Sequence, residues 1–276
     1  MPHSCAEEPM GDGGGVGQRS KRVVWPAEAI WESVAPLLPG FSVEVLPEVD
    51  STNTELMRRA RAGRMEPTLL VAERQTAGRG RLGRHWLGDG NGTSLTFSLG
   101  LALTPNDWSG LSLAVGLSIV ESLHPDLRLK WPNDVWWDDR KMAGILIETA
   151  NVGGARFAVI GVGINLTLPI GQDLRQPAAA LTELVSDVNA GAALSAVVLP
   201  LVHAVIAFER QGFEPMRNAY QARDVLRDRE VQCSDTTVGV ARGVDTTGAL
   251  LVHTAAGLQK ITSAEVSVRP LAGPTV

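Results

Sequence analysis

The sequence predicts an α+β fold: a mixed β-sheet domain packed with helices on one face, followed by a small SH3-like β-barrel domain. Between residues 41 and 222, apolar runs of strand length are interspersed with stretches of helical period. Several of these apolar runs are separated only by short polar or glycine breaks, which predict hairpin turns or short loops. From residue 224 the chain changes to short β-rich runs between polar turns, a texture typical of a small barrel.

The N-terminal half of the chain alternates between helices and strands. Residues 1–22 are polar and contain GDGGGVG, so we expect disorder there. A helix should begin near Pro26, because proline favours the first helical turn and apolar residues follow at helical spacing. The other expected elements, in order, are a strand at 41–49, a helix at 52–62 with a capping-box start, strands at 68–73 and 93–103, and a helix at 108–123.

The C-terminal half begins with three apolar runs, RLKWPNDVWW, KMAGILIETA and RFAVIGVGINL. We expect them to form strands broken by Asn-Asp, Asp-Asp and Gly-Gly turns. An irregular loop at 166–180 and helices at 181–187, 192–211 and 214–221 should follow. We therefore predict a disordered segment at 1–22, a main domain at 23–222 and a small C-terminal β domain at 223–276.

The composition restricts the class of protein. With 276 residues, 44% hydrophobic and 20% charged, the chain is typical of a globular protein with a large core. Its net charge of −5 argues against broad, non-specific nucleic-acid binding. Cys5 and Cys233 offer neither a disulfide framework nor the spacing of metal ligands. We find no run of about 18 apolar residues and no secretory signal, so we expect a cytoplasmic protein without a membrane partner.

Residues 75–86, QTAGRGRLGRHW, are the most informative stretch, and we call them the Arg-Gly loop. Three arginines alternate with glycines directly after an apolar run. Glycine lets the backbone approach a ligand closely, and arginine carries a fork of donors suited to carboxylate and phosphate. Adjacent guanidinium groups repel one another unless an anion lies between them. The pattern therefore predicts a loop that binds a multiply charged anion.

Three other interpretations of the Arg-Gly loop are weaker. Gly78 to Gly83 match the dinucleotide pattern G-x-G-x-x-G, but that pattern requires a helix start, and RHWLGDGNGT has no helical period. Arg-Gly stretches that contact nucleic acid are longer and lie in disordered surroundings. A solvated basic loop without a ligand stays open as an alternative from this stretch alone.

Four further clusters lie at the expected ends of helices or strands, where a rigid scaffold can hold ligand-binding groups. Ser51-Thr52-Asn53 begins a helix, so it could bind an anion or a carbonyl oxygen, or simply cap the helix. Lys130-Trp131-Pro132-Asn133-Asp134 could present an Asn-Asp pair or form an Asx turn. Lys141 opens a buried-looking strand but could be solvated. The glycines of Gly161-Val162-Gly163-Ile164-Asn165 could leave room for a flat ligand or serve tight strand packing.

The order STN, QTAGRGRLGR, KWPND, KMAGI and GVGIN resembles that of biotin protein ligases in motif and spacing, from about Val45 to Asn165. The C-terminal β region is similar to the family in size and texture. The resemblance implies an ATP-dependent ligase, which activates biotin as biotinyl-5′-AMP, releases pyrophosphate and transfers biotin to a lysine of a biotin carboxyl carrier protein. It also implies Mg²⁺, held mainly through the ATP phosphates rather than by a side-chain site.

Two related activities compete with this interpretation. Family members that are also DNA-binding repressors carry an additional winged helix-turn-helix before the catalytic domain. Only about 40 residues precede the first expected core strand, so we expect a short form that binds no nucleic acid. A lipoate- or octanoyl-transferring enzyme shares the scaffold, but the complete GRGRLGR loop together with KWPND favours biotin. We expect a monomer or a weak homodimer.

The resemblance also assigns roles to individual residues. Lys141, Arg79 and Arg81 are expected to be catalytic, and Asp134 is the nearest carboxylate that could take a proton in the transfer step. The residues expected to bind biotin are Ser51, Thr52, Asn53, Gln75, Gly78, Arg79, Gly80, Arg81, Lys141 and Gly144. Those expected to bind ATP or the adenylate are Arg81, Arg84, Trp86, Asn133, Asp134 and Asn165.

Overall fold

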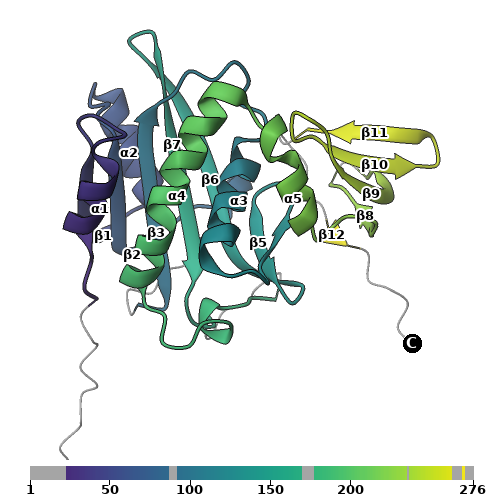
Figure 1. The fold of residues 1–276 in the computed structure, drawn as a ribbon, viewed down its shortest axis with the longest axis horizontal. Coiled ribbons are helices and arrows are strands. Elements are labelled where there is room, and N and C mark those ends of the chain that lie inside the picture. Colours follow the sequence, from purple (N-terminus) through teal and green to yellow (C-terminus); the bar gives the residue numbers. More distant parts are fainter. Residues whose placement is uncertain (1–22, 87–91, 170–176, 235, 263–268, 271–276) are drawn as a thin grey trace, which may run out of the picture.

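The computed structural model describes residues 23–86, 92–169, 177–234, 236–262 and 269–270. Its centre is a seven-stranded sheet with the strand order β1-β2-β3-β7-β6-β5-β4 (Figure 1). Strands β1 and β2 are parallel and the other neighbours are antiparallel, so the predicted mixed sheet is confirmed. The expected disorder of residues 1–22 falls outside the described residues. The strands are β1 Ser42–Val49, β2 Thr68–Gln75, β3 Ser94–Ala102, β4 Arg128–Lys130, β5 Asp134–Trp137, β6 Arg140–Val152 and β7 Ala155–Asn165.

Two tight hairpins place strands β5, β6 and β7 side by side. Asp138 and Asp139 have φ angles of 49° and 53°, and the pair 153–154 has φ angles of 56° and 87°. Positive φ at both central residues belongs to the hairpin turns whose twist matches that of the strands. The Asp-Asp and Gly-Gly breaks of the sequence are therefore turns. They bring Lys141 of β6 beside Asn165 of β7, whose Nδ2 lies 3.5 Å from the Lys141 carbonyl oxygen.

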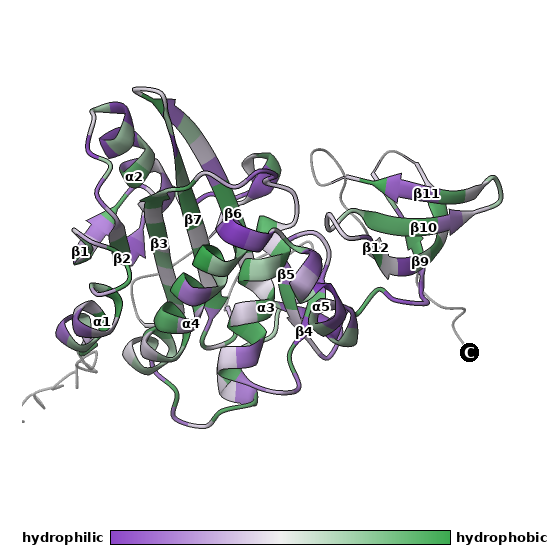
Figure 2. Cartoon of the chain, turned by 45° about the horizontal axis from the view of Figure 1, so that its top comes forward, coloured by the Kyte–Doolittle hydropathy of each residue, from purple (hydrophilic) through white to green (hydrophobic). Residues whose placement is uncertain are grey.

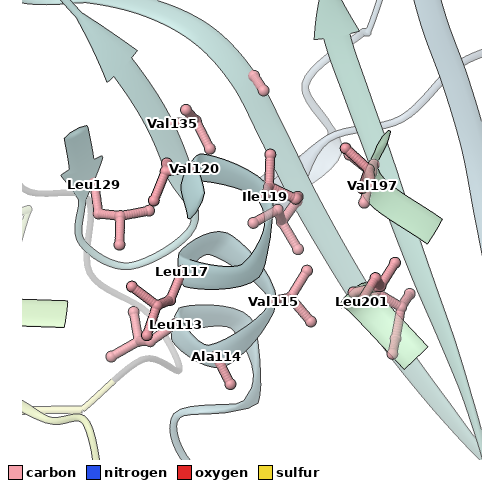
Figure 3. Close-up of a cluster of buried hydrophobic side chains, with 14 of the residues drawn as sticks. Leu113, Ala114, Val115, Leu117, Ile119, Val120, Leu129, Val135, Val197 and Leu201 are labelled. Carbon is pink, nitrogen blue, oxygen red and sulfur yellow. The ribbon is translucent and has the colours of Figure 1, made fainter. Parts of the chain in front are cut away.

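Helices α3 and α4 lie against one face of the sheet (Figure 1). Figure 3 shows Val115 and Ile119 on the side of α3 that faces Val197 and Leu201 of α4, and all four side chains are buried. The helix expected at 181–187 is only a 3-10 turn at Leu181–Glu183. The described helices are α1 Ala27–Val34, α2 Thr52–Arg61, α3 Leu111–Leu123, α4 Ala190–Gln211 and α5 Arg217–Arg223.

Helix α2 lies on the opposite face of the sheet, so the expectation of helices on one face only is wrong. Its residues Leu56, Met57 and Ala60 form a separate apolar cluster with Leu70 of β2 and Phe157 of β7. Successive residues of a strand point to opposite faces, and β2 is buried at each of its first five positions. A strand that is apolar on both faces needs a cover on both, and α2 supplies the second one.

Helix α4 is long and apolar enough in composition to cross a membrane, which corrects the expectation that the chain has no such run. Half of its apolar window is buried inside the structure, where Val197, Leu201 and Phe208 join the main core. A helix in the core of a protein can be apolar on most sides because neighbouring elements cover it. The packing of α4 therefore accounts for its composition.

A second, antiparallel sheet follows α5 and confirms the predicted small β domain, with the strand order β11-β10-β9-β8-β12. Figure 2 shows hydrophobic residues along the central strands of the main sheet and along β10. The indole Nε1 of Trp131 donates a hydrogen bond to the carbonyl oxygen of Gly248, 3.0 Å away, and so joins the two sheets. The strands are β8 Glu230–Gln232, β9 Val238–Val244, β10 Leu250–Thr254, β11 Gly257–Ile261 and β12 Arg269–Pro270.

Candidate functional site

One cavity of about 240 Å³ gathers the motifs that the sequence analysis singled out. It receives the start of α2, the end of β2, the Arg-Gly loop, the segment between β4 and β5, and the facing ends of β6 and β7. Every residue expected to bind biotin or ATP lines this cavity, with the exception of Gly78. A cavity of this kind suits a small ligand, and its lining combines apolar walls with a few polar groups.

One end of the cavity is a network of neutral polar side chains, which we call the amide end. It consists of the lining residues Ser51, Thr52, Asn53 and Gln75, together with the fully buried Ser98, which contacts two of them. The backbone N–H of Thr52 donates to Gln75 Oε1 at 2.8 Å, and the Ser98 hydroxyl lies 2.7 Å from Thr52 Oγ1 and 2.6 Å from Asn53 Oδ1. Ser51 caps α2 through the N–H of Thr54. These bonds fix the side chains of the amide end before any ligand arrives.

Within the amide end, Asn53 is held entirely by the protein. Its Nδ2 donates to the carbonyl oxygen of Leu146 at 3.1 Å and to Glu148 Oε2 at 2.9 Å, while its Oδ1 faces Ser98. Both amide protons are therefore used, whereas Gln75 contacts Thr52 through its oxygen and keeps its N–H groups. We conclude that Asn53 organises the amide end and that Gln75 can donate to a ligand carbonyl.

Two glycines of β7 make room for side chains of the site. A Cβ on Gly161 would lie 2.1 Å from Asn53 Oδ1, and a Cβ on Gly163 would lie 2.2 Å from the indole of Trp86. Both separations are far below van der Waals contact, so only glycine fits at these positions as they stand. The sequence indicated room for a flat ligand here. The flat groups that the structure places against these glycines are the amide of Asn53 and the ring of Trp86.

The opposite end of the cavity is rich in positive charge, and we call it the cationic end. Its cations are Arg81, Arg84, Lys130 and Lys141. Asp134 is the only acidic side chain among the described residues of the lining. Burial lowers the pKa of the Arg81 guanidinium against the effect of the Asp134 carboxylate, and the positive charge of Arg84 adds to the lowering. An excess of partly buried cations is a site prepared for an anion.

Lys141 is held in place through both its side chain and its backbone. Its Nζ lies 2.7 Å from Asp134 Oδ1, and its stem passes over Gly144, where a Cβ would come within 3.2 Å of Nζ. The N–H of Ala179 donates to the Lys141 carbonyl oxygen at 2.9 Å, and Asn165 Nδ2 donates to the carbonyl of the same alanine at 3.2 Å. The ammonium group is therefore fixed at the wall of the cavity rather than free in solvent.

The Arg-Gly loop folds back on itself. The N–H of Trp86 donates to the Gly78 carbonyl oxygen at 2.9 Å, and the N–H of Gly80 donates to the Arg84 carbonyl oxygen at 2.6 Å. A Cβ on Gly78 would lie 2.3 Å from the Trp86 carbonyl oxygen, so this glycine permits the return of the chain. Gly78 thus allows the two ends of the loop to pair, although it does not line the cavity. At the tip, Leu82 has a φ of 58°.

The sequence analysis gave no role to Ser98 or Glu148, and it named Lys130 only as part of a cluster, although Lys130 lines the cavity and the other two contact residues that line it. Ser98 links two residues of the amide end, Glu148 contacts both Asn53 and Arg79, and Lys130 is 4% exposed with its Nζ 4.5 Å from the centre of the Trp136 ring. The available signal was a polar residue inside an apolar strand. That signal does not say which partner the residue meets.

A side-chain metal site is not found in the part of the chain that the structure describes. No three His, Cys, Asp or Glu side chains gather there as a candidate ligand set. Asn133 is also committed to the protein, because its Nδ2 donates to the Ile145 carbonyl oxygen at 2.8 Å. Together, the two ends of the cavity can hold a neutral group that has both N–H and C=O functions and, beside it, a group with several negative charges.

Comparison with known proteins agrees with this geometry. The chain matches the model of the Biotin/lipoate A/B protein ligase family over residues 45–165 and that of the Biotin protein ligase C terminal domain over residues 231–269. The Bifunctional ligase/repressor BirA of Escherichia coli is 34% identical over 84% of this chain and 75% of its own length. The Biotin–[acetyl-CoA-carboxylase] ligase of Paracoccus denitrificans is 32% identical over 80% of this chain and 98% of its own. The structure of a biotin protein ligase from Aquifex aeolicus in complex with biotin and ATP has a TM-score of 0.72 and 30% identity, covering 83% of this chain and 99% of that one.

Proposed function

Since the chain belongs to the biotin/lipoate A/B protein ligase family, we propose how its residues carry out the reaction of a biotin protein ligase. The protein activates biotin as biotinyl-5′-AMP with release of pyrophosphate and then transfers biotin to a carrier protein. The observation that carries the residue-level proposal is that the amide end and the cationic end belong to one cavity. The predicted division into a catalytic domain at 23–222 and a β domain at 223–276 is part of this proposal.

The amide end binds the ureido ring of biotin. A cyclic urea presents one carbonyl oxygen and two N–H groups, and it therefore needs donors and acceptors close together. Gln75 keeps N–H groups for the carbonyl, while the hydroxyls of Ser51 and Thr52 can accept from ring N–H groups. Because Ser51 and Thr52 are almost fully buried, a ligand that fails to pair with their hydroxyl groups leaves part of their hydrogen-bonding capacity unused, which is costly.

The cationic end receives the biotin carboxylate and the phosphates of ATP. In the first step a carboxylate oxygen forms a bond to the α-phosphorus, and the bond from that phosphorus to the β-phosphate bridging oxygen breaks, so that pyrophosphate leaves. Attacking group and target are both anionic, and catalysis therefore consists mainly of positioning and charge neutralisation. Lys141, Arg81 and Arg84 supply the neutralising charge. No protein nucleophile is required.

The nucleotide itself lies against the Trp86 side of the cavity. The indole of Trp86 rests on Gly163, and its buried Nε1 has no hydrogen-bond partner among the residues that the structure describes. Asn133, Asp134 and Asn165 line the same side. The amide nitrogens of both asparagines are turned toward main-chain carbonyl oxygens. They therefore shape the wall and present their side-chain oxygens to the nucleotide.

The second step is the attack of an acceptor lysine amine on the acyl carbon of the mixed anhydride. The new C–N bond forms as the C–O bond to AMP breaks, and AMP leaves with the electron pair. The amine must lose a proton, and Asp134 is the carboxylate of the lining that can accept it. Because Lys141 is ion-paired with Asp134, we assign the aspartate two tasks, which are holding Lys141 before the first step and receiving the proton in the second.

Mg²⁺ fits this site as a companion of ATP. The lining offers the Asp134 carboxylate, and Mg²⁺ commonly uses one or two carboxylates together with substrate phosphates and waters. When bound, the ion would neutralise phosphate charge. We propose that the partner is a biotin carboxyl carrier protein and that the enzyme acts in the cytoplasm as a monomer or weak homodimer. The net charge of −5 supports a ligase that needs no nucleic acid for its activity.

Mass spectrometry tests this proposal directly. The protein is incubated with biotin, ATP and Mg²⁺, with and without a biotin carboxyl carrier domain, and with lipoate in place of biotin as the matched control. We expect biotinyl-5′-AMP without the carrier and one biotinylated lysine with it, and no lipoyl product. Transfer of lipoate at a rate equal to that of biotin would contradict the assignment of the amide end.

A further inference from the structure

Glu148 of β6 holds two parts of the site that are far apart in the sequence. Its two carboxylate oxygens lie 3.0 and 2.9 Å from one terminal nitrogen of Arg79. The oxygen at 2.9 Å also accepts from Asn53 Nδ2 at 2.9 Å. The side chain of Glu148 is 26% exposed and that of Arg79 is 45% exposed, so water screens the ion pair more than it screens the contact with the buried Asn53. Thus one carboxylate joins the Arg-Gly loop to the amide end.

On the Asn53 side, the carboxylate fixes which way the amide points. The nitrogen of Asn53 faces two acceptors, Glu148 and the Leu146 carbonyl oxygen, so its oxygen must face Ser98. Ser98 in turn contacts Thr52, whose backbone N–H holds Gln75. Glu148 therefore lies at the start of a chain of hydrogen bonds that ends at the proposed ligands of the ureido ring.

On the Arg79 side, the carboxylate compensates the charge of the guanidinium. The three arginines of the Arg-Gly loop thereby differ. Arg79 is ion-paired with Glu148, while Arg81 is partly buried at the cationic end beside Arg84, with Asp134 as the carboxylate that acts on its charge. Glu148 balances the charge of Arg79 one for one. At the cationic end, by contrast, the Asp134 carboxylate faces both Lys141 and Arg81, so an excess of positive charge is left there to neutralise a phosphate. The ion pair of Arg79 instead ties the loop to β6 at the point where Asn53 is also held.

We propose that Glu148 is a positioning residue for the ligase, which fixes the Arg-Gly loop to the amide end, and that Arg79 acts through this ion pair rather than by binding phosphate. The inference rests on the proposed function, since it explains how biotin recognition and the order of the anion-binding loop are linked. Arg81, Arg84 and Lys141 then provide the charge for adenylation.

The substitution Glu148→Gln separates the two roles of Arg79. A glutamine can accept from Asn53 or from Arg79, but its own N–H₂ group then faces the other donor. We expect the KM for biotin to rise by about tenfold and the adenylation kcat to change by less than about threefold, because Glu148 holds the residues proposed to bind the ureido ring and does not supply charge at the reacting phosphate. Arg79→Ala should give the same pattern. The double variant should be no worse than the poorer single one, because both remove one interaction.

A different pattern of kinetic constants is expected if Arg79 binds phosphate directly. If Arg79 binds phosphate and Glu148 merely restrains it, Glu148→Gln frees the guanidinium, so adenylation is unchanged or faster. Arg79→Ala then lowers kcat by about 100-fold, as the loss of an electrostatic donor does. That combination would overturn the proposal. Glu48→Gln is the matched control, because Glu48 pairs with Arg74 across β1 and β2 outside the cavity, and it should leave both constants unchanged.

A second readout does not depend on activity. Trypsin cleaves after arginine, and cleavage after Arg81 and Arg84 reports on the order of the Arg-Gly loop in the free protein. We expect Glu148→Gln to be cut there about tenfold faster than wild type and Glu48→Gln to be cut at the wild-type rate, with thermal melting confirming that both are folded. Equal cleavage of all three proteins would overturn the proposal. Failure of the wild type to form biotinyl-5′-AMP would instead contradict the proposed function and leave this loop measurement valid.

Discussion

The two ends of the cavity are organised in different ways. At the amide end, hydrogen bonds link Thr52, Asn53, Gln75 and Ser98 to one another, so their positions are set before a ligand binds. At the cationic end, several arginines and lysines face a single carboxylate, that of Asp134, among the described lining residues. The first arrangement selects a ligand by geometry and the second attracts it by charge.

This difference separates recognition from chemistry. A network whose side chains hold one another in place, and which keeps the Gln75 N–H groups for the ligand, favours one ligand because a poorer ligand leaves those polar groups unpaired. The cations of the cationic end repel one another when no anion is bound. They therefore stabilise most strongly the negative charge that develops in the transition state of phosphoryl transfer. Substitutions at the amide end should therefore change the KM for biotin, and substitutions at the cationic end should change kcat or the use of ATP.

The largest effect is expected at the cationic end, for Lys141→Ala. We propose that the Lys141 ammonium group lies beside the biotin carboxylate and the α-phosphate, so its removal should lower the rate of adenylate formation by on the order of 10²–10³-fold, which is the usual loss for one electrostatic donor. The KM for biotin should change little, because the amide end is intact. Single-turnover formation of biotinyl-5′-AMP, followed by mass spectrometry, measures this rate.

Lys260→Ala is the matched control for Lys141→Ala. Lys260 is also ion-paired with an aspartate, Asp245, but lies on β11 of the second sheet, and its side chain is 67% exposed. It should retain wild-type adenylation. If Lys141→Ala is folded and forms the adenylate as fast as this control, Lys141 is not part of the charge-neutralising group.

A smaller effect is expected at the junction of the two sheets, away from both ends of the cavity. Burial raises the pKa of Asp224 to about 6 from its usual 3.8. An acid whose pKa is higher in the folded than in the unfolded state destabilises the fold as pH rises through that interval, because ionisation is easier after unfolding. Wild-type stability should fall between pH 4 and 6 by at most about 3 kcal/mol.

Asp224→Asn should remove this pH dependence. Asparagine keeps the side-chain oxygen that accepts from the N–H of Leu226 at 2.9 Å but has no proton to lose. Thermal denaturation should therefore show the variant to be more stable than wild type at pH 8 and equal to it near pH 4, with both KM values unchanged. Parallel pH profiles for the two proteins would show that Asp224 does not titrate as its burial implies.

Much of this architecture could be predicted from the sequence, because it depends on local rules. Two-residue breaks such as Asp138-Asp139 predict hairpins, and the alternation of apolar residues predicts strands. The second cover of the sheet was missed, since a continuous apolar run such as 68–72 shows that a strand is buried on both faces but does not name the covering helix. The turn at Leu181–Glu183 was overestimated as a helix because short helical patterns carry little information about length.

The composition of the cavity was also predictable, but its internal contacts were not. The motifs named nearly all of the lining residues, since each lies at the end of a strand or helix. Partners such as Glu148 and Asn53 are 95 positions apart, and no local pattern joins them. The same holds for Gly163 and Trp86, whose contact exists only because β7 and the returning Arg-Gly loop meet. Long-range contacts of this kind follow from the fold as a whole.

One pair of substitutions tests the separation of the two ends most directly. Gly161 and Gly163 lie two positions apart on β7, and an added methyl group would strike Asn53 at the first and Trp86 at the second. Gly100→Ala on β3 is the control, because its methyl would meet Phe157 outside the cavity at 2.9 Å. We expect an added methyl group that overpacks one end of the cavity to raise the KM of the ligand bound there by on the order of tenfold.

The measurement is the pair of KM values, for biotin and for ATP, in wild type and in each alanine variant, with melting temperatures to confirm folding. We predict that Gly161→Ala raises the KM for biotin and leaves the KM for ATP unchanged. Gly163→Ala should raise the KM for ATP and leave the KM for biotin unchanged, and Gly100→Ala should change neither constant. If Gly161→Ala and Gly163→Ala both raise the two KM values equally, the cavity acts as one undivided site and the separation of recognition from chemistry is wrong.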